Sequence, residues 1–85
     1  MITPQLHELK TIPPYFIQVL NGKKTFELRY NDRNFKVHDV LYLKEYYPES
    51  DTYSGNNVLV RVLYVLKEFK GLEPGYCILG ISKPI

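Results

Sequence analysis

The seven residues from Lys23 to Arg29 bring together amine, hydroxyl, carboxylate and guanidinium groups. An alternation with period two places Thr25, Glu27 and Arg29 on one face of an extended segment, with Lys23 and Lys24 just before it. The guanidinium of Arg29 suits a phosphate or a base edge, and Lys24 is a compact cation. The carboxylate of Glu27 can accept a hydrogen bond from an exocyclic amine or exchange a proton. The alternative is a polar strand face on which Glu27 and Arg29 pair only with their neighbours.

Five residues outside this segment are further candidates for the same site. Histidine has an unperturbed pKa of about 6.5, which suits acid–base chemistry, so His7 is a candidate; simple packing or solvation is its alternative role. Lys10 and Arg33 carry charges that suit phosphate contacts. Tyr46 and Tyr76 offer flat faces for stacking, which is worth about 1 to 3 kcal/mol per base in single-strand binders.

The elements that must position these residues follow from the spacing of apolar residues. A helix is predicted at about residues 14–21, with Thr11 as a nearby cap, Pro13 and Pro14 in its first turn and Gly22 at its end. Extended segments are predicted at residues 6–9, 25–30, 39–46, 58–66 and 76–81, with a hairpin connection at residues 48–57.

The order of these elements predicts the fold class. One helix and several strands, without long crossover helices, disfavour a parallel α/β sheet. We therefore predict a mainly β (α+β) fold with one or two short helices, arranged as a small closed or nearly closed β-barrel, because closure removes exposed strand edges. The segment 58–66 is the longest predicted strand, with Val58, Val60, Val62 and Tyr64 on one of its faces.

Length and composition exclude several classes of protein. The 85 residues leave room for a single domain, residues 1–85. The lone Cys77 cannot form an internal disulfide, and the absence of a signal peptide favours a cytoplasmic protein. Because His7 and His38 lack partners at zinc-ligand spacing, we expect no metal and no other cofactor. No stretch approaches the roughly 20 apolar residues that span a bilayer, so we expect no membrane partner.

The charge of the chain is unevenly distributed. Residues 1–36 carry six basic and three acidic groups, whereas residues 37–85 carry five basic and six acidic groups. This bias favours an anionic partner for the N-terminal part, although a solvated surface produces similar biases.

Several short motifs in a fixed order carry a resemblance to a known family. They are His7-Glu8-Leu9-Lys10, Tyr15-Phe16, Gly22-Lys23-Lys24-Thr25-Phe26-Glu27-Leu28-Arg29, Asn31-Asp32-Arg33, Leu43-Lys44-Glu45-Tyr46 and Gly75-Tyr76-Cys77-Ile78-Leu79-Gly80-Ile81. With these motifs, which span nearly the whole chain, the sequence resembles the short PUA-like proteins of bacteria and phages, a domain of unknown function related to the ASCH domains.

The resemblance implies a PUA-like β-barrel of ASCH type, with a cleft between the helix and the strand after it and a tendency to bind RNA. We expect His7 at the edge of this cleft. Some ASCH relatives are amidohydrolases that act on acylated nucleosides with a lysine and a threonine from a Gly-x-Lys-Thr-x-Thr-x-Arg stretch and a later glutamate. Lys24 matches that lysine, whereas Glu27 stands in place of the threonine and no later glutamate is matched. His38 stands where the superfamily usually has Gly, which implies an altered turn.

Three functions fit these features. The first is a module that binds RNA or a modified nucleotide in a basic cleft, and this is the one we favour. The second is a small amidohydrolase acting on an acylated nucleoside, with Lys24, Glu27 and His7 as catalytic candidates. The third is a protein-interaction module whose tyrosine-rich strands contact a protein partner. The predicted binding residues for the first function are Lys10, Lys23, Lys24, Thr25, Glu27, Arg29, Arg33, Tyr46 and Tyr76.

Overall fold

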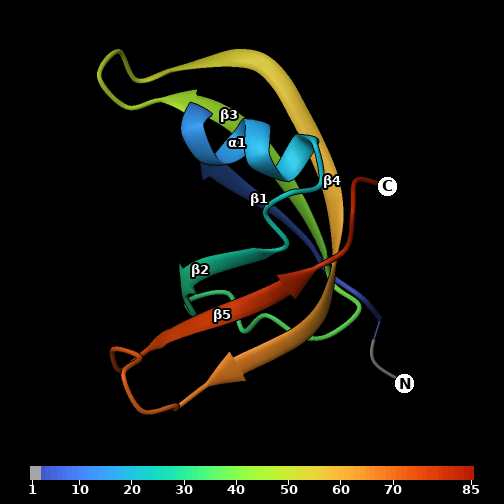
Figure 1. Cartoon of the computed structure of the whole chain (residues 1–85), viewed down its shortest axis with the longest axis vertical. Helices are drawn as coiled ribbons and strands as arrows, with labels where there is room; N and C mark the ends of the chain where they lie inside the picture. The colour runs from blue at the N-terminus through green and yellow to red at the C-terminus, as the bar shows by residue number, and fades with distance from the viewer. Residues whose placement is uncertain (1–2) are drawn as a thin grey trace.

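Five strands and one helix form the part of the chain that the computed structural model describes, residues 3–85. In chain order they are β1 (Leu6–Thr11), α1 (Pro13–Leu20), β2 (Phe26–Tyr30), β3 (Val40–Tyr47), β4 (Thr52–Lys67) and β5 (Tyr76–Ile81). The strands join in the order β1-β3-β4-β5-β2, with β1 and β3 parallel and the other pairs antiparallel (Figure 1). The predicted mainly β class with a short helix is confirmed for these residues; residues 1 and 2 of the predicted domain 1–85 lie outside them.

The long, curved strand β4 connects the two halves of the sheet (Figure 1). Its first half pairs with β3 and its second half with β5. Val58, Val60 and Val62 are buried, and the pairing register shifts between Val62 and Tyr64. Because such a bulge reverses the side-chain alternation, Tyr64 is 64% exposed and Val65 packs against the core instead. The prediction that Tyr64 shares a face with these valines is therefore wrong.

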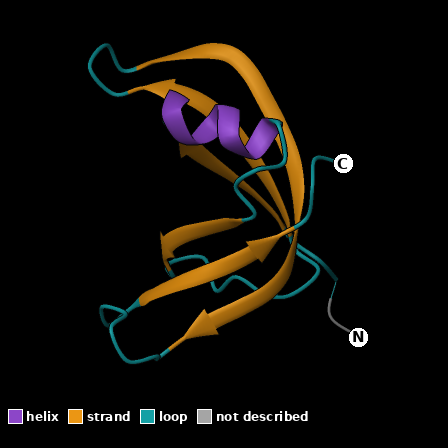
Figure 2. Cartoon of the chain, viewed as in Figure 1, coloured by secondary structure: helices purple, strands orange, loops and turns teal. Residues whose placement is uncertain are grey.

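The hydrophobic core lies where α1 covers one face of the sheet (Figure 2). The helix packs on β3 and buries Phe16 and Val19 against Leu41 and Leu43. Strands β1, β4 and β5 add further apolar residues, whereas β2 adds none, since Glu27 is its single buried residue. The strand that carries the candidate site is thus held by backbone pairing to β5 rather than by its own apolar side chains.

Most predicted strands occur within one or two residues of their expected bounds, and the predicted hairpin at 48–57 is present, but its connection is shorter than predicted. Strand β4 already begins at Thr52, and Tyr53 pairs with Tyr46 across the hairpin. The turn-forming residues Ser54-Gly55-Asn56 lie inside the strand, next to a register shift in β3 between Lys44 and Tyr46. These three residues have no register partner on β3 and form a bulge, and pairing at Asn57 and at Tyr53 continues the strand on either side of it.

The start of α1 also differs from the prediction. The N-cap residue is Ile12, which makes no side-chain cap, and the helix opens with two prolines that have no N–H to satisfy. Thr11 is instead the last residue of β1, and its Oγ1 accepts a hydrogen bond from Arg29 Nη2 at 3.2 Å. The end of α1 is as predicted, because Gly22 has a φ of +79° directly after the helix.

The sheet is open, so the predicted barrel is not confirmed. Strands β1 and β2 are the two edges of the sheet, and no backbone pairing joins them within residues 3–85. Two guanidinium groups span the gap instead. Arg29 Nη2 donates to the Lys10 carbonyl at 3.0 Å, and Arg33 Nη1 donates to the Glu8 carbonyl at 2.8 Å. In a closed barrel, backbone N–H groups of β2 would donate to carbonyls of β1. Here the side chains of Arg29 and Arg33 donate to two of these carbonyls instead.

Candidate functional site

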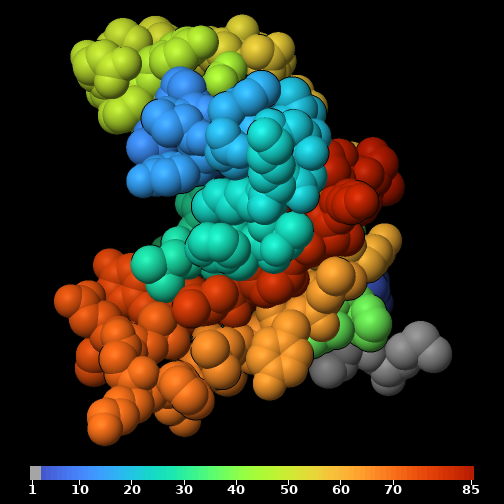
Figure 3. Space-filling view, in the orientation of Figure 1, coloured from blue at the N-terminus to red at the C-terminus, as the bar shows by residue number. Residues whose placement is uncertain are grey.

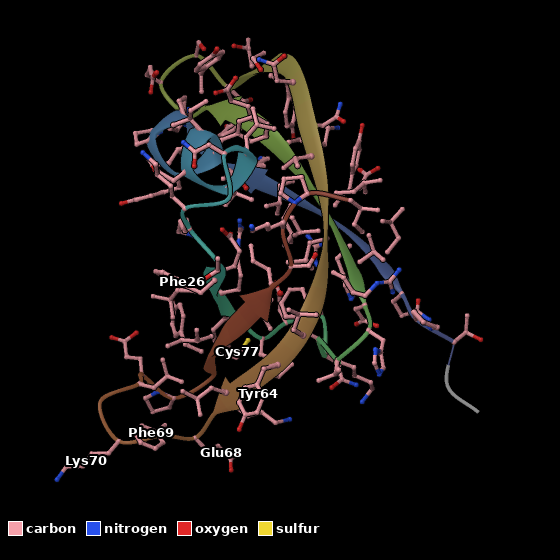
Figure 4. The ribbon with its side chains drawn as sticks, turned by 45° about the vertical axis from the view of Figure 1, so that its right-hand side comes forward. Phe26, Tyr64, Glu68, Phe69, Lys70 and Cys77 are labelled. Carbon is pink, nitrogen blue, oxygen red and sulfur yellow. The ribbon has the colours of Figure 1, made fainter. Side chains whose placement is uncertain are left out.

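Strand β2 turns its charged face inward and its apolar face outward. Glu27 is only 3% exposed, whereas Phe26, Leu28 and Tyr30 are each about half exposed. Glu27 and Arg29 lie on the same face, as the period-two alternation predicts, and they are hydrogen-bonded to each other. Phe26 projects from the start of the strand (Figure 4). The inward face of β2 is therefore a polar surface beside the core.

The carboxylate of Glu27 is held between two cations. Lys24 Nζ donates to Oε2 at 2.6 Å, and Arg29 donates to Oε1 from Nε at 3.1 Å and from Nη2 at 2.8 Å. Lys24 also donates to the Phe26 carbonyl at 2.6 Å and lies 4.8 Å from the centroid of the Phe26 ring. Because each group has several fixed partners, the three side chains are pre-organised before any ligand arrives.

A pocket of about 450 Å³ opens over this ion cluster, and we call it the cleft pocket. It lies between the end of β1, the start of α1 and strand β2, and Figure 3 shows a hollow between the blue segment containing α1 and the teal segment containing β2. Its polar part comes from Glu27 and its partners, while its walls are apolar or aromatic. The lining residues are Lys10, Thr11, Ile12, Tyr15, Lys24, Phe26, Glu27, Leu28 and Arg29.

The chemistry of the cleft pocket suits a flat molecule with polar edges. Small-molecule sites typically have volumes of about 300 to 1,000 Å³, with mostly apolar walls and a few placed polar groups. Tyr15 and Phe26 are exposed aromatic walls. A carboxylate has about four lone-pair sites, and Glu27 uses three of them for Lys24 and Arg29. One acceptor site therefore remains for a donor on a ligand.

Only some of the predicted residues meet at this pocket. Lys10, Lys24, Glu27 and Arg29 line it. Lys23 and Thr25 are exposed and do not line it. The Lys23 amide binds Asn21 Oδ1, and the Thr25 carbonyl accepts from Ile81, so both residues serve the turn into β2 through their backbones.

The other predicted binding residues lie elsewhere. Arg33 lines a second pocket that borders the first. Tyr46 lies beneath the Lys10 amine, 4.5 Å from ring centroid to Nζ, and donates to Asp51 at 2.5 Å, which raises the pKa of Tyr46. Tyr76 makes an edge contact with Tyr30 at a third pocket.

His7 does not reach the cleft, so its expected place at the cleft edge is wrong. Its Nε2 lies 2.8 Å from Asp39 Oδ2, and its ring packs edge-on against Phe35. His7 and Thr11 share the inward face of β1, but four residues of strand, or about 13 Å, separate them. Burial acts to raise the pKa of Asp39, but hydrogen bonds from the Gln5 amide, His7 and the Lys36 amide together hold it below its usual value.

Several residues that line the pocket are absent from the predicted site. Thr11 is predicted as a helix cap, and Tyr15, Phe26 and Leu28 are not among the predicted binding residues. The alternation in β2 could show two faces but could not tell which one points inward. The charged face of the strand after the helix predicts the ion cluster of Lys24, Glu27 and Arg29. It does not predict the apolar and aromatic residues that form the walls of the pocket.

Two features are absent from residues 3–85. No group of three or more His, Cys, Asp or Glu side chains is placed to hold a metal ion. No helix among these residues has the length and apolar character needed to cross a membrane.

Comparison with known proteins gives two matches. Residues 6–81 match the family described as "Domain of unknown function (DUF3850)". A 58-residue stretch is 38% identical to an "Uncharacterized 12.9 kDa protein in GpA 3'region" of Escherichia phage P2, covering 68% of this chain and 51% of that protein. The chain therefore matches about half the length of this curated relative.

Proposed function

The chain belongs to the family described as Domain of unknown function (DUF3850), and within that family we propose that it binds RNA, or a modified nucleotide, through a base held in the cleft pocket. The observation that carries this proposal is the buried Glu27 carboxylate, which is fixed by Lys24 and Arg29 and lines the cleft pocket. It offers an acceptor for an exocyclic amine, and the neighbouring cations suit the phosphates of the same ligand.

Energetics support a role beyond stability for this cluster. Replacing a buried ion pair by apolar residues of similar volume is often neutral or stabilising, so stability alone does not explain a carboxylate at this position. The aromatic walls add a second feature, because bases stack on Tyr and Phe faces in proteins that bind single strands. Tyr15 is 53% exposed on the first turn of α1 and is available for such a contact.

The proposal also includes a relationship of this fold to a known superfamily. We place the chain among the PUA-like folds of ASCH type, because its order of one short strand, one helix and four strands fits that resemblance and its cleft lies between the helix and the next strand. We also propose that the protein is located in the cytoplasm, because its buried Cys77 is unpaired and because RNA is present in that compartment.

A binding titration with two matched tyrosine variants tests the proposal. A labelled single-stranded RNA of about eight nucleotides, within the usual range of site sizes, is titrated with protein at low salt and followed by fluorescence anisotropy. We expect Tyr15→Ala to weaken binding about tenfold, because it removes a stacking face worth about 1 to 3 kcal/mol. Tyr64→Ala removes a tyrosine of similar exposure away from the pocket and should bind like the wild type.

The proposal fails if the wild-type protein shows no binding to the RNA at low salt. Equal affinities of Tyr15→Ala and the wild type would also contradict it, because the RNA would then lie outside the cleft pocket.

A second candidate is the amidohydrolase, and one contact favours it. The hydroxyl of Thr11 lies in the same pocket as the Lys24–Glu27 pair and is linked to it through Arg29. A threonine from β1 therefore shares the pocket with the lysine, although Glu27 takes the place of the second threonine of the motif. Hydrolysis of an acylated base would bond the oxygen of water to the acyl carbon, break the C–N bond and leave a proton on the departing amine. Lys24 and Glu27 are placed to exchange that proton.

Incubation with an acylated cytidine tests this candidate. We expect the wild type to release cytidine and Lys24→Ala to release none, while Lys23→Ala, a neighbouring lysine outside the pocket, should keep the wild-type rate. A wild-type rate no higher than that of Lys24→Ala would contradict hydrolysis and leave binding as the function.

A further inference from the structure

A second pocket of about 480 Å³ lies beside the cleft pocket, and we call it the basic pocket. Lys10 and Arg29 line both pockets, so the two are neighbouring compartments along the gap between β1 and β2. The basic pocket is also lined by Arg33, Lys44 and Tyr53. It therefore gathers cations from β1, β2, β3 and the turn after β2.

Most of these cations have no neutralising partner. Arg29 is paired with Glu27, but Lys10, Arg33 and Lys44 have no carboxylate within 4.0 Å among residues 3–85. Glu8 and Asp32 also line the pocket, yet neither forms an ion pair within this part of the chain. An open pocket with three unpaired cations favours an anionic ligand.

Aromatic rings hold the two lysines in place without cancelling their charge. Lys10 and Lys44 are register partners on the parallel strands β1 and β3. Lys10 Nζ lies 4.5 Å from the centroid of Tyr46, and Lys44 Nζ lies 4.5 Å from the centroid of Tyr53. The two rings contact each other at 5.3 Å and form a platform under both amines. Cation–π contacts orient an ammonium group while its N–H donors stay available.

The guanidinium of Arg33 is positioned in a comparable way. One nitrogen, Nη1, donates to the Glu8 carbonyl at 2.8 Å, which fixes the side chain across the gap. Within residues 3–85 the rest of its donors have no hydrogen-bond partner. A planar fork with unused donors suits the oxygens of a phosphate.

We infer that the basic pocket binds the phosphate next to the base held in the cleft pocket, so that the ligand is an RNA strand with phosphodiester links rather than a free nucleoside. This inference rests on the proposed function, because it assigns the base to the cleft pocket. Lys10 and Arg29, which line both compartments, then lie between the base and its phosphate.

Charge-removing variants of two unpaired cations of the pocket test the inference. The same RNA is titrated at several salt concentrations against the wild type, Lys44→Gln and Arg33→Gln. We expect each variant to weaken binding at low salt about five- to tenfold, and to reduce the slope of log K against log salt by about 0.7, the value for one lost phosphate contact on a single strand. Lys70→Gln removes the same charge at the tip of the β4–β5 connection (Figure 4) and should change neither quantity.

The outcomes separate this inference from the proposed function. Wild-type binding that is weakened by Tyr15→Ala but unchanged in both Lys44→Gln and Arg33→Gln would overturn the phosphate site and leave the base site standing. No wild-type binding at all would overturn the proposed function itself. An RNA with neutral methylphosphonate links gives a check that does not depend on how the variants fold: the wild type should lose affinity for it, and equal affinity for both RNAs would contradict the inference.

Discussion

The Glu27 carboxylate is the residue on which the candidate site depends. It is almost fully buried, yet it belongs to a strand that contributes no apolar residue to the core. Lys24 and Arg29 supply the three hydrogen bonds that compensate for its loss of hydration. Glu27 in turn neutralises both cations, which also donate to carbonyls of Phe26 and Lys10.

Substitution of Glu27 by Gln should destabilise the protein. A glutamine retains the shape, but its NH2 group would face one of the two cations and the compensating charge would be lost. We expect a decrease in the free energy of unfolding of about 2 kcal/mol, less than for a fully buried pair because Lys24 and Arg29 keep some access to solvent. Urea unfolding measures it, with the exposed Glu73→Gln as the control; equal midpoints for both variants would show that the cluster does not stabilise the fold.

The backbone of His38 gives an independent residue-level prediction. His38 has a φ of +83°, in the region that glycine adopts without steric cost, and the family resemblance implies a glycine at this position. We expect His38→Gly to raise the free energy of unfolding by up to about 1 kcal/mol, since relief of the strained φ exceeds the entropy cost of glycine. His38→Ala should not stabilise, and a gain of the same size in both variants would contradict a backbone origin.

Asp39 connects two elements by accepting hydrogen bonds from both. Its Oδ1 accepts from the Gln5 amide just before β1, and its Oδ2 accepts from the Lys36 amide before β3 and contacts His7 in β1. The start of the parallel β1–β3 pair is thus fixed by one buried carboxylate. This arrangement places His7, a catalytic candidate from the sequence, in the β1–β3 contact and outside the lining of the cleft pocket.

The lowered pKa of Asp39 predicts a loss of stability in acid. A carboxyl group whose pKa is lower in the folded state contributes stability that is complete above its unfolded pKa, about 3.9, and that is lost as the pH falls through the lower folded value. The urea midpoint of the wild type should therefore fall in this acid range. Asp39→Asn, which cannot titrate, should be less stable near neutral pH and show a smaller acid slope; an unchanged slope would assign the effect to other carboxyl groups.

The sequence predicts which segments are helix or strand better than it predicts the residues at which they begin and end. The strand from Phe26 to Tyr30 and the strand from Tyr76 to Ile81 follow directly from alternation and turn residues. The beginning of β4 does not, because Gly55 and its neighbours have turn preferences and lie in a bulge, and the strand is continued only by pairing with β3 on either side of it. The bulge after Val62 is equally hidden, since a register shift leaves no mark in the local pattern.

The open edge between β1 and β2 governs the shape of the whole molecule. A closed barrel was predicted because few strands leave costly edges, but guanidinium groups from Arg29 and Arg33 cap carbonyls of β1 instead. This leaves the gap lined by side chains, and both pockets lie along it. We call the cleft pocket and the basic pocket together the groove. The groove exists because β1 and β2 do not pair to close the sheet.

The groove shows what the sequence could and could not predict. The ion cluster of Lys24, Glu27 and Arg29 is local, so spacing along one strand was enough to find it. Lys44 and Tyr53 join the groove only through the β1–β3 and β3–β4 registers, which depend on pairing across the whole sheet. Sequence periodicity carries no information about such registers, and both residues were missed.

The most direct test of the central claim is a map of RNA contacts on the folded protein. Amide chemical shifts of isotope-labelled protein are followed by NMR during titration with the single-stranded RNA at low salt. We expect the largest changes on both sides of the groove, in residues 10–15 and 26–29, with smaller changes near Lys44. Changes confined to the β4–β5 connection at residues 68–75, or no changes at all, would contradict the assignment of the groove as an RNA site.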